Sequence, residues 1–501
     1  MCMVENYPDP SSIQAPFFAN KSCDPFTSPN DPCRYGNYVR YTVNVSTPDD
    51  VAATVAFAKE YNIRFVIRNT GHDYLGRSTG AGAISVWTHH LKDIAFLDWD
   101  DANYTGKAVK VGAGVQGFEV LEVAKDQGLV VLTGECPSVG IAGGYTQGGG
   151  HSALATSFGL SADNTLQFEV ITADGQFVTA SPSENPDLYW ALSGGGGGNF
   201  AVVYSMTVKA HPEAYVGGVN IDISTAGISN DTFDEGIRAF STELAALVDA
   251  GSMVIAIITP TSFQIGPVTA YNKTAAEVEA AWNPFLTTLS DLNITYTVNY
   301  TESPTYYDHF VSFFGPLPTG TFAEVGIAQY GGRLVPRSTF EGNTTAWVQT
   351  IRSILDLGSV NVTFVAVDVS GFADYERNAV VPAWRMDSGP VIHTLLSTPW
   401  SFDPEEWGQM LAYQKLMTDT VMPALEAVTP GSGAYMNEGD FLQPNFQQAF
   451  FGSKYERLLK IKKKYDPDSL FYATKGVGSE AWTVAQDGHM CRTGVGRKSE
   501  L

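Results

Sequence analysis

Residues 133–164 read TGECPSVGIAGGYTQGGGHSALATSFGLSADN, and seven glycines fall between Gly134 and Gly150. A backbone with so few side chains brings its amide groups against a phosphate or a flat ring. Cys, Val, Ile, Tyr and Leu are interleaved with the glycines, which favours a packed segment over a flexible low-complexity loop. No Gly-Lys-Ser/Thr follows, so this is not a P-loop, and GHSAL lacks the second glycine of a nucleophile elbow. The stretch predicts a ligand-binding loop.

Two further glycine-bearing turns lie in the same half of the chain. RNTGHDY, Arg68 to Tyr74, follows the apolar run IRFVI, and Gly194 to Gly198 precede Asn199. Taken alone, His72 is open to the roles of base, metal ligand, covalent anchor or polar surface residue. Three such turns favour an extended ligand that carries phosphates, so a dinucleotide is preferred over a sugar or a metal.

A different dinucleotide-binding fold is a weaker alternative. Gly112-Ala-Gly114-Val-Gln-Gly117 matches G-x-G-x-x-G between a predicted strand and a predicted helix, and Glu135 lies about twenty residues further on. The strand LVVL, residues 129–132, then runs into more glycine loop and not into another strand–helix unit. We therefore expect a tight turn here and not a Rossmann fingerprint.

Local patterns predict an α+β chain. TPDDVAATVAFAKEYNI, residues 47–63, predicts a helix with Thr47 as N-cap. LQFEVITADGQFVTA, residues 166–180, predicts a hairpin that turns at Asp174-Gly175. After about residue 212 the glycine clusters stop, and longer helices alternate with Val/Thr/Ile strands. A basic helix begins at YERLLKIKKKY, residues 455–465, and ends before Asp-Pro.

Composition places the chain outside the cytoplasm. The net charge is −23 and the pI about 4.6, which argues against nucleic acid and anionic membranes as partners. No apolar run reaches the length of a membrane span. Nine N-x-S/T sequons predict N-glycans on a secreted chain. They begin at Asn20, Asn44, Asn103, Asn230, Asn272, Asn293, Asn299, Asn343 and Asn361. MCMVENYPDP lacks an apolar core, so we expect a chain whose signal peptide has been removed.

The five cysteines predict disulfides and one odd thiol. Cys2, Cys23 and Cys33 lie near the start, and a Cys23–Cys33 bridge is expected to order the loop SCDPFTSPNDPC. H-E-x-x-H and C-x-x-C are absent, and His89 and His90 point apart on a strand, so no catalytic metal is expected.

At this point the residues resemble a known family. The chain is similar to fungal secreted oxidases of the vanillyl-alcohol-oxidase (VAO) flavoprotein superfamily, in the berberine-bridge-enzyme-like branch and its isoamyl-alcohol-oxidase-like subgroup. The resemblance rests on RNTGHDY, GECPSVG, GGGHS, NPDLYWALSGGGGG, YMNEGD and FFGSKYERLLKIKKKYDPDSLFY. It implies a PCMH-type FAD-binding domain of two α/β subdomains and an antiparallel-sheet substrate domain flanked by helices. The expected segments are 1–34 (disulfide-bearing), 35–211 (FAD-binding), 212–432 (substrate) and 433–501 (returning to the FAD domain).

The resemblance also implies how FAD is held. His72 would bond the flavin 8α carbon and Cys136 flavin C6, which would account for the odd thiol, raise the flavin potential and fix the ring. Val139 stands at the family's oxygen-gate position, where a small side chain leaves space for O₂. The other expected cofactor contacts are Arg68, Asn69, Thr70, Gly71, Asp73, Gly140, Gly143, Gly144, Gly150, Ser152, Gly198, Asn199 and Val202.

The expected chemistry is hydride transfer from a small-molecule substrate, with O₂ reduced to H₂O₂. Relatives carry Tyr in N-Y-x-D, whereas here Asn437-Glu438-Gly-Asp440 has Glu at that position. Glu438 is the first candidate base, or else a structural acid, and Tyr435 is the second candidate. The expected substrate is an alcohol, carbohydrate or phenol. The alternatives are a secondary-metabolite oxidase that closes a ring or dehydrogenates, and an idle flavin-binding protein. A monomer is expected.

Overall fold

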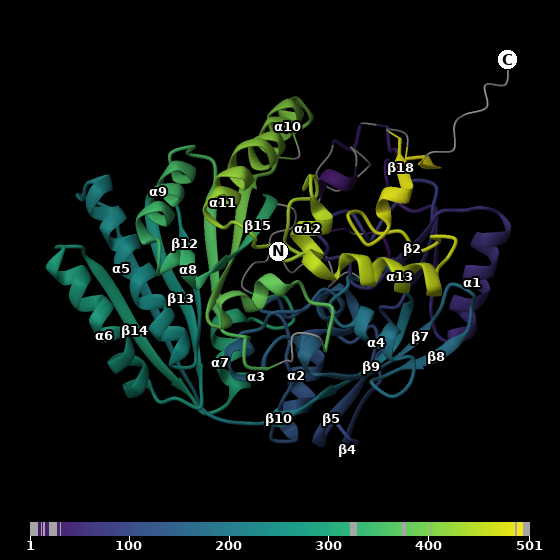
Figure 1. Ribbon diagram of the computed structural model, residues 1–501, viewed down its shortest axis with the longest axis horizontal. Helices are drawn as coiled ribbons and strands as arrows, with labels where there is room; N and C mark the ends of the chain where they lie inside the picture. The colour runs from purple at the N-terminus through teal and green to yellow at the C-terminus, as the bar shows by residue number, and fades with distance from the viewer. Residues whose placement is uncertain are drawn as a thin grey trace.

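A computed structural model describes residues 9–11, 13, 16–19, 28–30, 32–320, 328–372, 377–401, 403–485 and 488–493. Two regions built around separate sheets lie side by side, and the C-terminal segment packs on the first of them (Figure 1). We call residues 32–212 the glycine-loop region, residues 216–428 the seven-stranded region and residues 434–485 the C-terminal segment. No helix among the described residues is both long and apolar enough to cross a membrane.

The glycine-loop region begins with a small parallel sheet and one helix. The strands are β1 (Tyr41–Asn44), β3 (Ile84–Trp87) and β2 (Phe65–Arg68), in that order. Helix α1 (Pro48–Glu60) starts as predicted, because Thr47 caps it in a capping box with Asp50. Its buried face, Val51, Val55 and Ala58, packs into the core. Strand β2 ends where the RNTGHDY loop begins, so the parallel sheet delivers His72 to one edge.

A five-stranded antiparallel sheet forms the other half of this region, in the order β4-β5-β9-β7-β8. The strands are β4 (Ile94–Asp100), β5 (Thr105–Gly112), β7 (Thr165–Ile171), β8 (Phe177–Ala180) and β9 (Val202–Lys209). The predicted hairpin is confirmed, because β7 pairs with β8 and Gly175 has φ +83°. Both neighbours of β5 are antiparallel to it, so GAGVQG is no Rossmann fingerprint.

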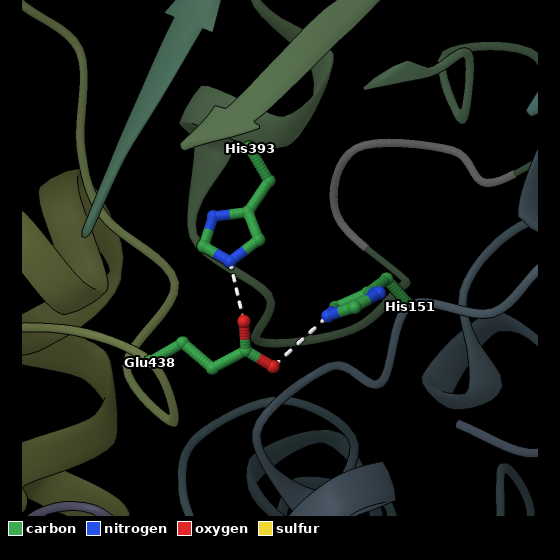
Figure 2. Close-up of side chains that lie close together, drawn as sticks. All are labelled: His151, His393 and Glu438. Carbon is green, nitrogen blue, oxygen red and sulfur yellow. Dashed lines mark hydrogen bonds and ion pairs between the residues drawn. The ribbon is translucent and has the colours of Figure 1, made fainter. Parts of the chain in front are cut away.

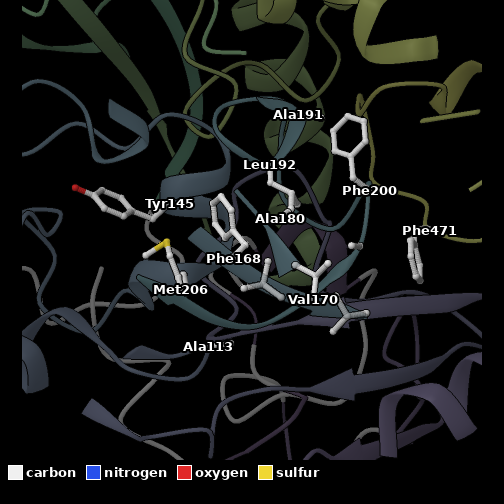
Figure 3. Close-up of a cluster of buried hydrophobic side chains, with 14 of the residues drawn as sticks. Ala113, Tyr145, Phe168, Val170, Ala180, Ala191, Leu192, Phe200, Met206 and Phe471 are labelled. Atoms are coloured by element: carbon white, nitrogen blue, oxygen red, sulfur yellow. The ribbon is translucent and has the colours of Figure 1, made fainter. Parts of the chain in front are cut away.

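Shorter elements lie between or after the strands of the five-stranded sheet, and η3, α3 and η4 among them belong to the glycine loop of residues 133–164. They are α2 (Gly117–Asp126), β6 (Leu129–Val130), η3 (Ile141–Tyr145), α3 (Ala155–Phe158), η4 (Ser161–Asp163), α4 (Pro186–Leu192) and β10 (His211–Pro212). The core beneath them is aromatic and aliphatic, with Phe168, Phe200 and Met206 almost completely buried (Figure 3). Tyr145 from the glycine loop packs on this cluster, so the loop is part of the core, as its interleaved apolar residues predict.

The second region is a seven-stranded antiparallel sheet, in the order β14-β11-β13-β12-β16-β17-β15. Its strands are β11 (Val216–Ser224), β12 (Ser252–Ile258), β13 (Ser262–Tyr271), β14 (Tyr296–Ser303), β15 (Ala328–Pro336), β16 (Asn361–Val367) and β17 (Val391–Pro399). Helices cover one face of this sheet, and the other face is turned toward the glycine-loop region (Figure 1). The expected helix-flanked antiparallel sheet is therefore confirmed.

Most helices of this region pack on the outer face of the sheet, whereas α7 packs on the inner side. The helices of the seven-stranded region are α5 (Asn230–Asp249), α6 (Ala275–Asp291), α7 (Tyr306–Phe314), α8 (Arg337–Phe340), α9 (Thr344–Leu355), η5 (Pro382–Ser388), η6 (Pro404–Glu406), α10 (Trp407–Leu416), η7 (Met417–Val421) and α11 (Met422–Val428).

The C-terminal segment returns to the glycine-loop region. It contains α12 (Phe446–Phe451), η8 (Gly452–Lys454), α13 (Tyr455–Tyr465) and η9 (Ser479–Ala481). Strand β18 (Trp482–Val484) then pairs with β19 (Met490–Arg492) in a two-stranded sheet. The Arg457 guanidinium of α13 lies 3.8 Å from the ring centroid of Trp190 in α4. Lys462, buried in α13, donates to Asp466 and to the carbonyls of Asn199 and Phe471. The contacts of Arg457 with Trp190 and of Lys462 with Asn199 hold the C-terminal segment against the glycine-loop region.

Candidate functional site

A cavity of about 760 Å³ lies between the two regions. The RNTGHDY loop and the glycine loop form one wall, and the inner face of the seven-stranded sheet and α7 form the other. The C-terminal segment supplies Tyr435, Asn437 and Glu438. Three parts of the chain that are far apart in sequence therefore meet at one site.

Glycine is required where the first two loops touch. A Cβ on Gly140 would lie 1.9 Å from Oδ1 of Asn69. Asn69 cannot easily move, because its Nδ2 donates to the carbonyl of Ala113 at 2.5 Å and to Oγ1 of Thr88 at 3.1 Å. The third glycine run joins this arrangement, since a Cβ on Gly197 would lie 2.8 Å from Cα of Gly144. The three glycine-rich turns thus converge, as the sequence predicted.

Gly144 and Gly198 play a different part. Both line the cavity, and a Cβ on either would meet no protein atom within 4 Å. Their missing side chains leave bare backbone facing open space, which suits a flat ring or a phosphate that needs close approach to amides. The residues present therefore fit FAD, the cofactor that the sequence led us to expect.

The two expected anchors meet at one buried hydroxyl. Ser138 is completely buried, and its Oγ lies 3.2 Å from Nε2 of His72 and 3.5 Å from Sγ of Cys136. On its other side the His72 ring lies 2.7 Å from Thr70, between Nδ1 and Oγ1. His72 and Cys136 are both half-buried and line the cavity. The geometry therefore presents an imidazole and a sulfur to the same part of the cavity.

The cysteine chemistry differs from the expectation in one respect. Cys33 and Cys136 each take part in a disulfide in this structure, and the free cysteine among the described residues is the exposed Cys491. The odd thiol expected at Cys136 is therefore found at Cys491. The predicted partner of Cys33, Cys23, lies outside the described residues, as does Cys2. A sulfur engaged in a disulfide cannot also bond flavin C6, so attachment through Cys136 requires its thiol.

A chain of titratable groups crosses the cavity beside these loops (Figure 2). Oε1 of Glu438 lies 3.0 Å from Nε2 of His151, and Oε2 lies 2.7 Å from Nε2 of His393. The other ring nitrogen of His151 lies 3.3 Å from a carboxylate oxygen of Glu135. His151 comes from the GGGHS loop, His393 from β17 and Glu438 from the C-terminal segment. One carboxylate thus joins all three parts of the molecule.

The charges in this chain are unequal. Burial disfavours a charged imidazole at His151, but Glu135 and Glu438 outweigh it and raise the pKa of His151 well above its ordinary value. Burial dominates at His393 and lowers its pKa, despite Glu438. At Glu438 burial acts in the opposite sense, but the two histidines lower its pKa far below the ordinary range. The two acidic side chains therefore favour a proton on His151, whereas burial disfavours one on His393.

Tyr435 is poorly suited to act as a base. Burial raises the pKa of its phenol far above the ordinary value, and Glu438 adds to the shift. Its ring packs at 5.3 Å from His151, 5.5 Å from His393 and 5.6 Å from Trp384 between centroids. Asn437 donates to its hydroxyl at 2.8 Å and to the carbonyl of Gly144 at 2.8 Å. Asn437 therefore links Tyr435 to the glycine loop, and the carboxylate that faces them is that of Glu438.

The structure brings most of the predicted site residues together. Those that line the cavity are Asn69, Thr70, Gly71, His72, Asp73, Cys136, Val139, Gly140, Gly143, Gly144, Gly198, Tyr435, Asn437 and Glu438. Those that do not are Arg68, Gly150, Ser152, Asn199 and Val202. Arg68 is buried in β2 and its Nη2 donates to the carbonyl of Asp9, and Val202 begins β9. Direct contact of these five with FAD stays a prediction.

Three titratable residues of this cluster were not predicted from the sequence as site residues. Glu135 and His151 sit inside the motifs GECPSVG and GGGHS, where glycine density drew attention to the backbone and not to the side chains. His393 had only its residue type in its favour. For Glu135 and His151, the strongest sequence signal was their position beside the glycines. The ligand atoms of His151, His393 and Glu438 lie within 4.8 Å of one another. Their short contacts are N–H to carboxylate hydrogen bonds, which explains the cluster without a metal ion.

Family models match both ends of this site. A model described as "FAD binding domain" matches residues 39–181, and one described as "Berberine and berberine like" matches residues 434–478. The first match contains His72, Cys136 and His151, and the second contains Glu438. The two chain segments that contact across the cavity are therefore the two that the family models recognise.

Two fungal proteins are similar to the chain over most of its length. It is 56% identical to the FAD-linked oxidoreductase ZEB1 of Gibberella zeae over 485 residues, which is 97% of this chain and 84% of that protein. It is 46% identical to the FAD-linked oxidoreductase patO of Aspergillus clavatus, over 96% of this chain and 83% of that protein. The crystal structure of VAO-type flavoprotein MtVAO615 from Myceliophthora thermophila is 40% identical, with a TM-score of 0.91 over 97% of this chain and 88% of the other.

Proposed function

The chain belongs to the VAO-type FAD-linked oxidoreductases with a berberine-bridge-like C-terminal segment, and from this premise we propose that it is an oxidase of alcohols. The observation that carries the proposal is the contact of Glu438 with His151 and His393 at the cavity wall. FAD, when bound, accepts hydride from the substrate carbon and passes the electrons to O₂, which gives H₂O₂. The protein's own residues have to bind the alcohol and take its hydroxyl proton.

Glu438 is the group that takes this proton. Its side chain is 20% exposed, whereas the side chains of His151 and His393 are 8% and 0% exposed. Both carboxylate oxygens are already oriented by imidazole N–H groups, so no side chain has to move before the substrate binds. A carboxylate with a lowered pKa is a weak base on its own. Here the proton enters a chain of two carboxylates and one imidazolium, whose net charge of minus one favours uptake of one proton.

His151 and Glu135 complete this chain. As Glu438 gains a proton, it ceases to stabilise the positive charge of His151, and the proton can be shared along Glu438, His151 and Glu135. Because the three groups interact strongly, their titration belongs to the set and not to one residue. His393 contributes by holding the second carboxylate oxygen at 2.7 Å from its Nε2.

We extend the proposal to bicovalent attachment of FAD, through His72 to the 8α carbon and, in chains in which Cys136 is not disulfide-bonded, through the Cys136 thiol to C6. In support, both side chains face the cavity and both contact Ser138. Val139, which follows Ser138 in the chain, is half-buried at the cavity wall. In this proposal its small side chain leaves space for O₂. Peptide mass spectrometry after proteolysis tests the two attachment sites separately.

We also propose that the protein is secreted and glycosylated and acts as a monomer. In support, the eight sequon asparagines among the described residues are all exposed. A glycan needs an acceptor that projects into solvent, so none of these eight is disqualified by burial. Treatment of the protein from its native host with an endoglycosidase, followed by intact mass measurement, tests this part.

The experiment for the oxidase function uses the flavin-loaded protein and a peroxide-coupled assay across alcohols, sugars and phenols. Anaerobic mixing with each compound, followed at the flavin absorbance band, measures hydride transfer without O₂. We expect bleaching and peroxide with at least one class of alcohol, both strongly reduced in the Glu438→Gln variant. Bleaching by no member of the panel would leave the chain as a flavin-binding protein without oxidase activity.

A further inference from the structure

We propose that the substrate is a neutral alcohol whose hydroxyl-bearing carbon lies at the end of an extended apolar body, and not an oligosaccharide. This inference rests on the proposed oxidase function and deepens it. It is drawn from the inner face of the seven-stranded sheet, the wall of the cavity that lies opposite the glycine loops.

The pairing of the strands shows which side chains line the cavity at increasing distance from Glu438. His393, which contacts Glu438, pairs with Val365 on β16, and Val365 pairs with Ile255 on β12. Two residues further along these strands, Leu395 pairs with Thr363, which pairs with Ile257. Side chains two residues apart share a face of a sheet, so this set lies on the inner face with His393. The cavity wall next to the base is therefore mostly branched aliphatic.

Polar groups come one step later and are neutral. Beyond Leu395 on β17 lies Ser397, which pairs with Asn361 on one side and with Tyr330 on the other. Among the described residues, the sheet and α7 contribute no charged side chain to the cavity lining. An anionic or cationic substrate would lose its hydration at this wall without gaining a partner there. The lining instead suits an apolar body that ends beside neutral polar groups.

Two aromatic rings of this wall pack against other rings of the protein. Tyr330 stacks on Tyr74 of the RNTGHDY loop with ring centroids 4.2 Å apart and an angle of 23° between planes. Tyr330 is only 5% exposed, so its ring closes the gap between the two regions. Phe313 packs at 4.6 Å from the ring of His309. Sugar recognition needs open aromatic faces together with polar groups for each hydroxyl, whereas the side chains that follow His393 along the sheet are mostly aliphatic.

The inference has a measurable consequence in a series of straight-chain primary alcohols from ethanol to decanol. Each methylene buried against this wall is expected to raise kcat/KM by up to about fourfold, until the chain reaches the cavity mouth. Xylobiose, a neutral disaccharide, is expected to be turned over at least a hundredfold less efficiently than the best alcohol. A flat response to chain length, or a preference for xylobiose, would overturn the inference while leaving the oxidase function intact.

A substitution on β17 tests whether the dependence of kcat/KM on chain length arises at the sheet wall. Leu395→Asn is expected to lower kcat/KM for octanol at least tenfold and for ethanol less than threefold, because only the longer chain reaches this position. Leu357→Asn is the matched control, since Leu357 is 37% exposed and does not line the cavity. Equal losses for both alcohols in Leu395→Asn, or an octanol loss in Leu357→Asn, would contradict the assignment.

Binding without turnover separates this inference from the proposed function. The ether 1-methoxyoctane has no hydroxyl proton, so it tests the wall alone. We expect it to raise the melting temperature of the flavin-loaded protein and to inhibit competitively, whereas xylobiose at equal concentration does neither. If no alcohol is oxidised but the ether still stabilises the protein, the oxidase proposal fails and the apolar site stands. If xylobiose stabilises the protein and the ether does not, the inference itself fails.

Discussion

Oε1 of Glu438 lies 3.0 Å from Nε2 of His151, although 287 positions separate the two residues in the chain. The contact joins the C-terminal segment to the glycine loop directly across the cavity. The contact between Glu438 and His151 therefore exists only when the chain has returned to its first region. This arrangement explains why a short C-terminal segment carries a family signature of its own.

Glu438→Gln should abolish most of the catalytic rate and spare flavin binding. An amide keeps the shape of the side chain but cannot take the hydroxyl proton, and a positioned base contributes about 10²- to 10⁴-fold. Stopped-flow reduction under anaerobic conditions should show the loss in the hydride-transfer step. Glu122→Gln, an exposed change on α2, serves as the control and should be unaffected. A Glu438→Gln enzyme with near-normal reduction would assign the base elsewhere.

Tyr435→Phe distinguishes the two candidate bases. Because the pKa of the Tyr435 phenol is raised far above the ordinary range, its hydroxyl should stay protonated and serve only to orient Asn437. We expect a loss of less than about tenfold in the rate of flavin reduction, far smaller than that of Glu438→Gln. If the two variants lose activity equally, the tyrosine takes part in proton transfer.

Much of the fold was predictable because its signals are local. Thr47 and Pro48 mark the start of α1, and Asp174-Gly175 sets the turn of the β7–β8 hairpin. The glycine loops were recognised as a binding site because their glycines sit among apolar residues that must pack. The boundaries of the four expected segments remain a prediction.

The acid–base chain was only partly predictable, because its members meet through tertiary structure. Glu438 stands out locally as a departure from the family's tyrosine. His393 lies on the inner face of β17 solely because strand register places it beside Val365, and a lone histidine in an apolar strand carries no such information. The charge of His151 depends on Glu135 and Glu438 together, which only the folded chain brings within reach.

Gly144→Val should block the cofactor and leave the protein folded. A Cβ at Gly144 would meet no protein atom within 4 Å, and Gly144 lines the cavity, so the substitution is expected to project into the cavity and not into the core. We expect a normal far-ultraviolet circular dichroism spectrum and a ratio of flavin to protein absorbance at least fivefold lower. Gly408→Val is the matched control, since its Cβ also meets open space but lies outside the cavity. Full flavin content in Gly144→Val would show that the cofactor does not approach this backbone.

His309→Gln should make stability less sensitive to acid. His309 is completely buried with Nε2 2.9 Å from Oγ1 of Thr269, and burial lowers its pKa to about 3. In the unfolded chain the pKa of this imidazole is about 6.5, so the unfolded chain binds a proton that the folded chain does not bind. The free energy of unfolding therefore decreases as the pH falls below about 6.5. Between about pH 6.5 and 3 this residue adds a slope of about 1.4 kcal/mol per pH unit.

Denaturant unfolding at several pH values between 4 and 7 measures that slope. His309→Gln should flatten the curve in this window, while the exposed His90→Gln should leave it unchanged. An unaltered slope in His309→Gln would mean that the buried imidazole gains its proton without unfolding.

Removing the two anchors one at a time should reveal whether each holds the flavin. His72→Ala and Cys136→Ala should each keep yellow colour in the acid-precipitated protein, because one covalent bond survives, and the double variant should release all flavin to the supernatant. Each single variant should also show a lower flavin reduction potential, since a substituent on the ring has been lost. Release of flavin from either single variant would show that one bond carries the attachment alone. Retention in the double variant would place the bond on another residue. Cys491→Ala, at the exposed free thiol, is the control and should match the unmodified protein in colour and potential.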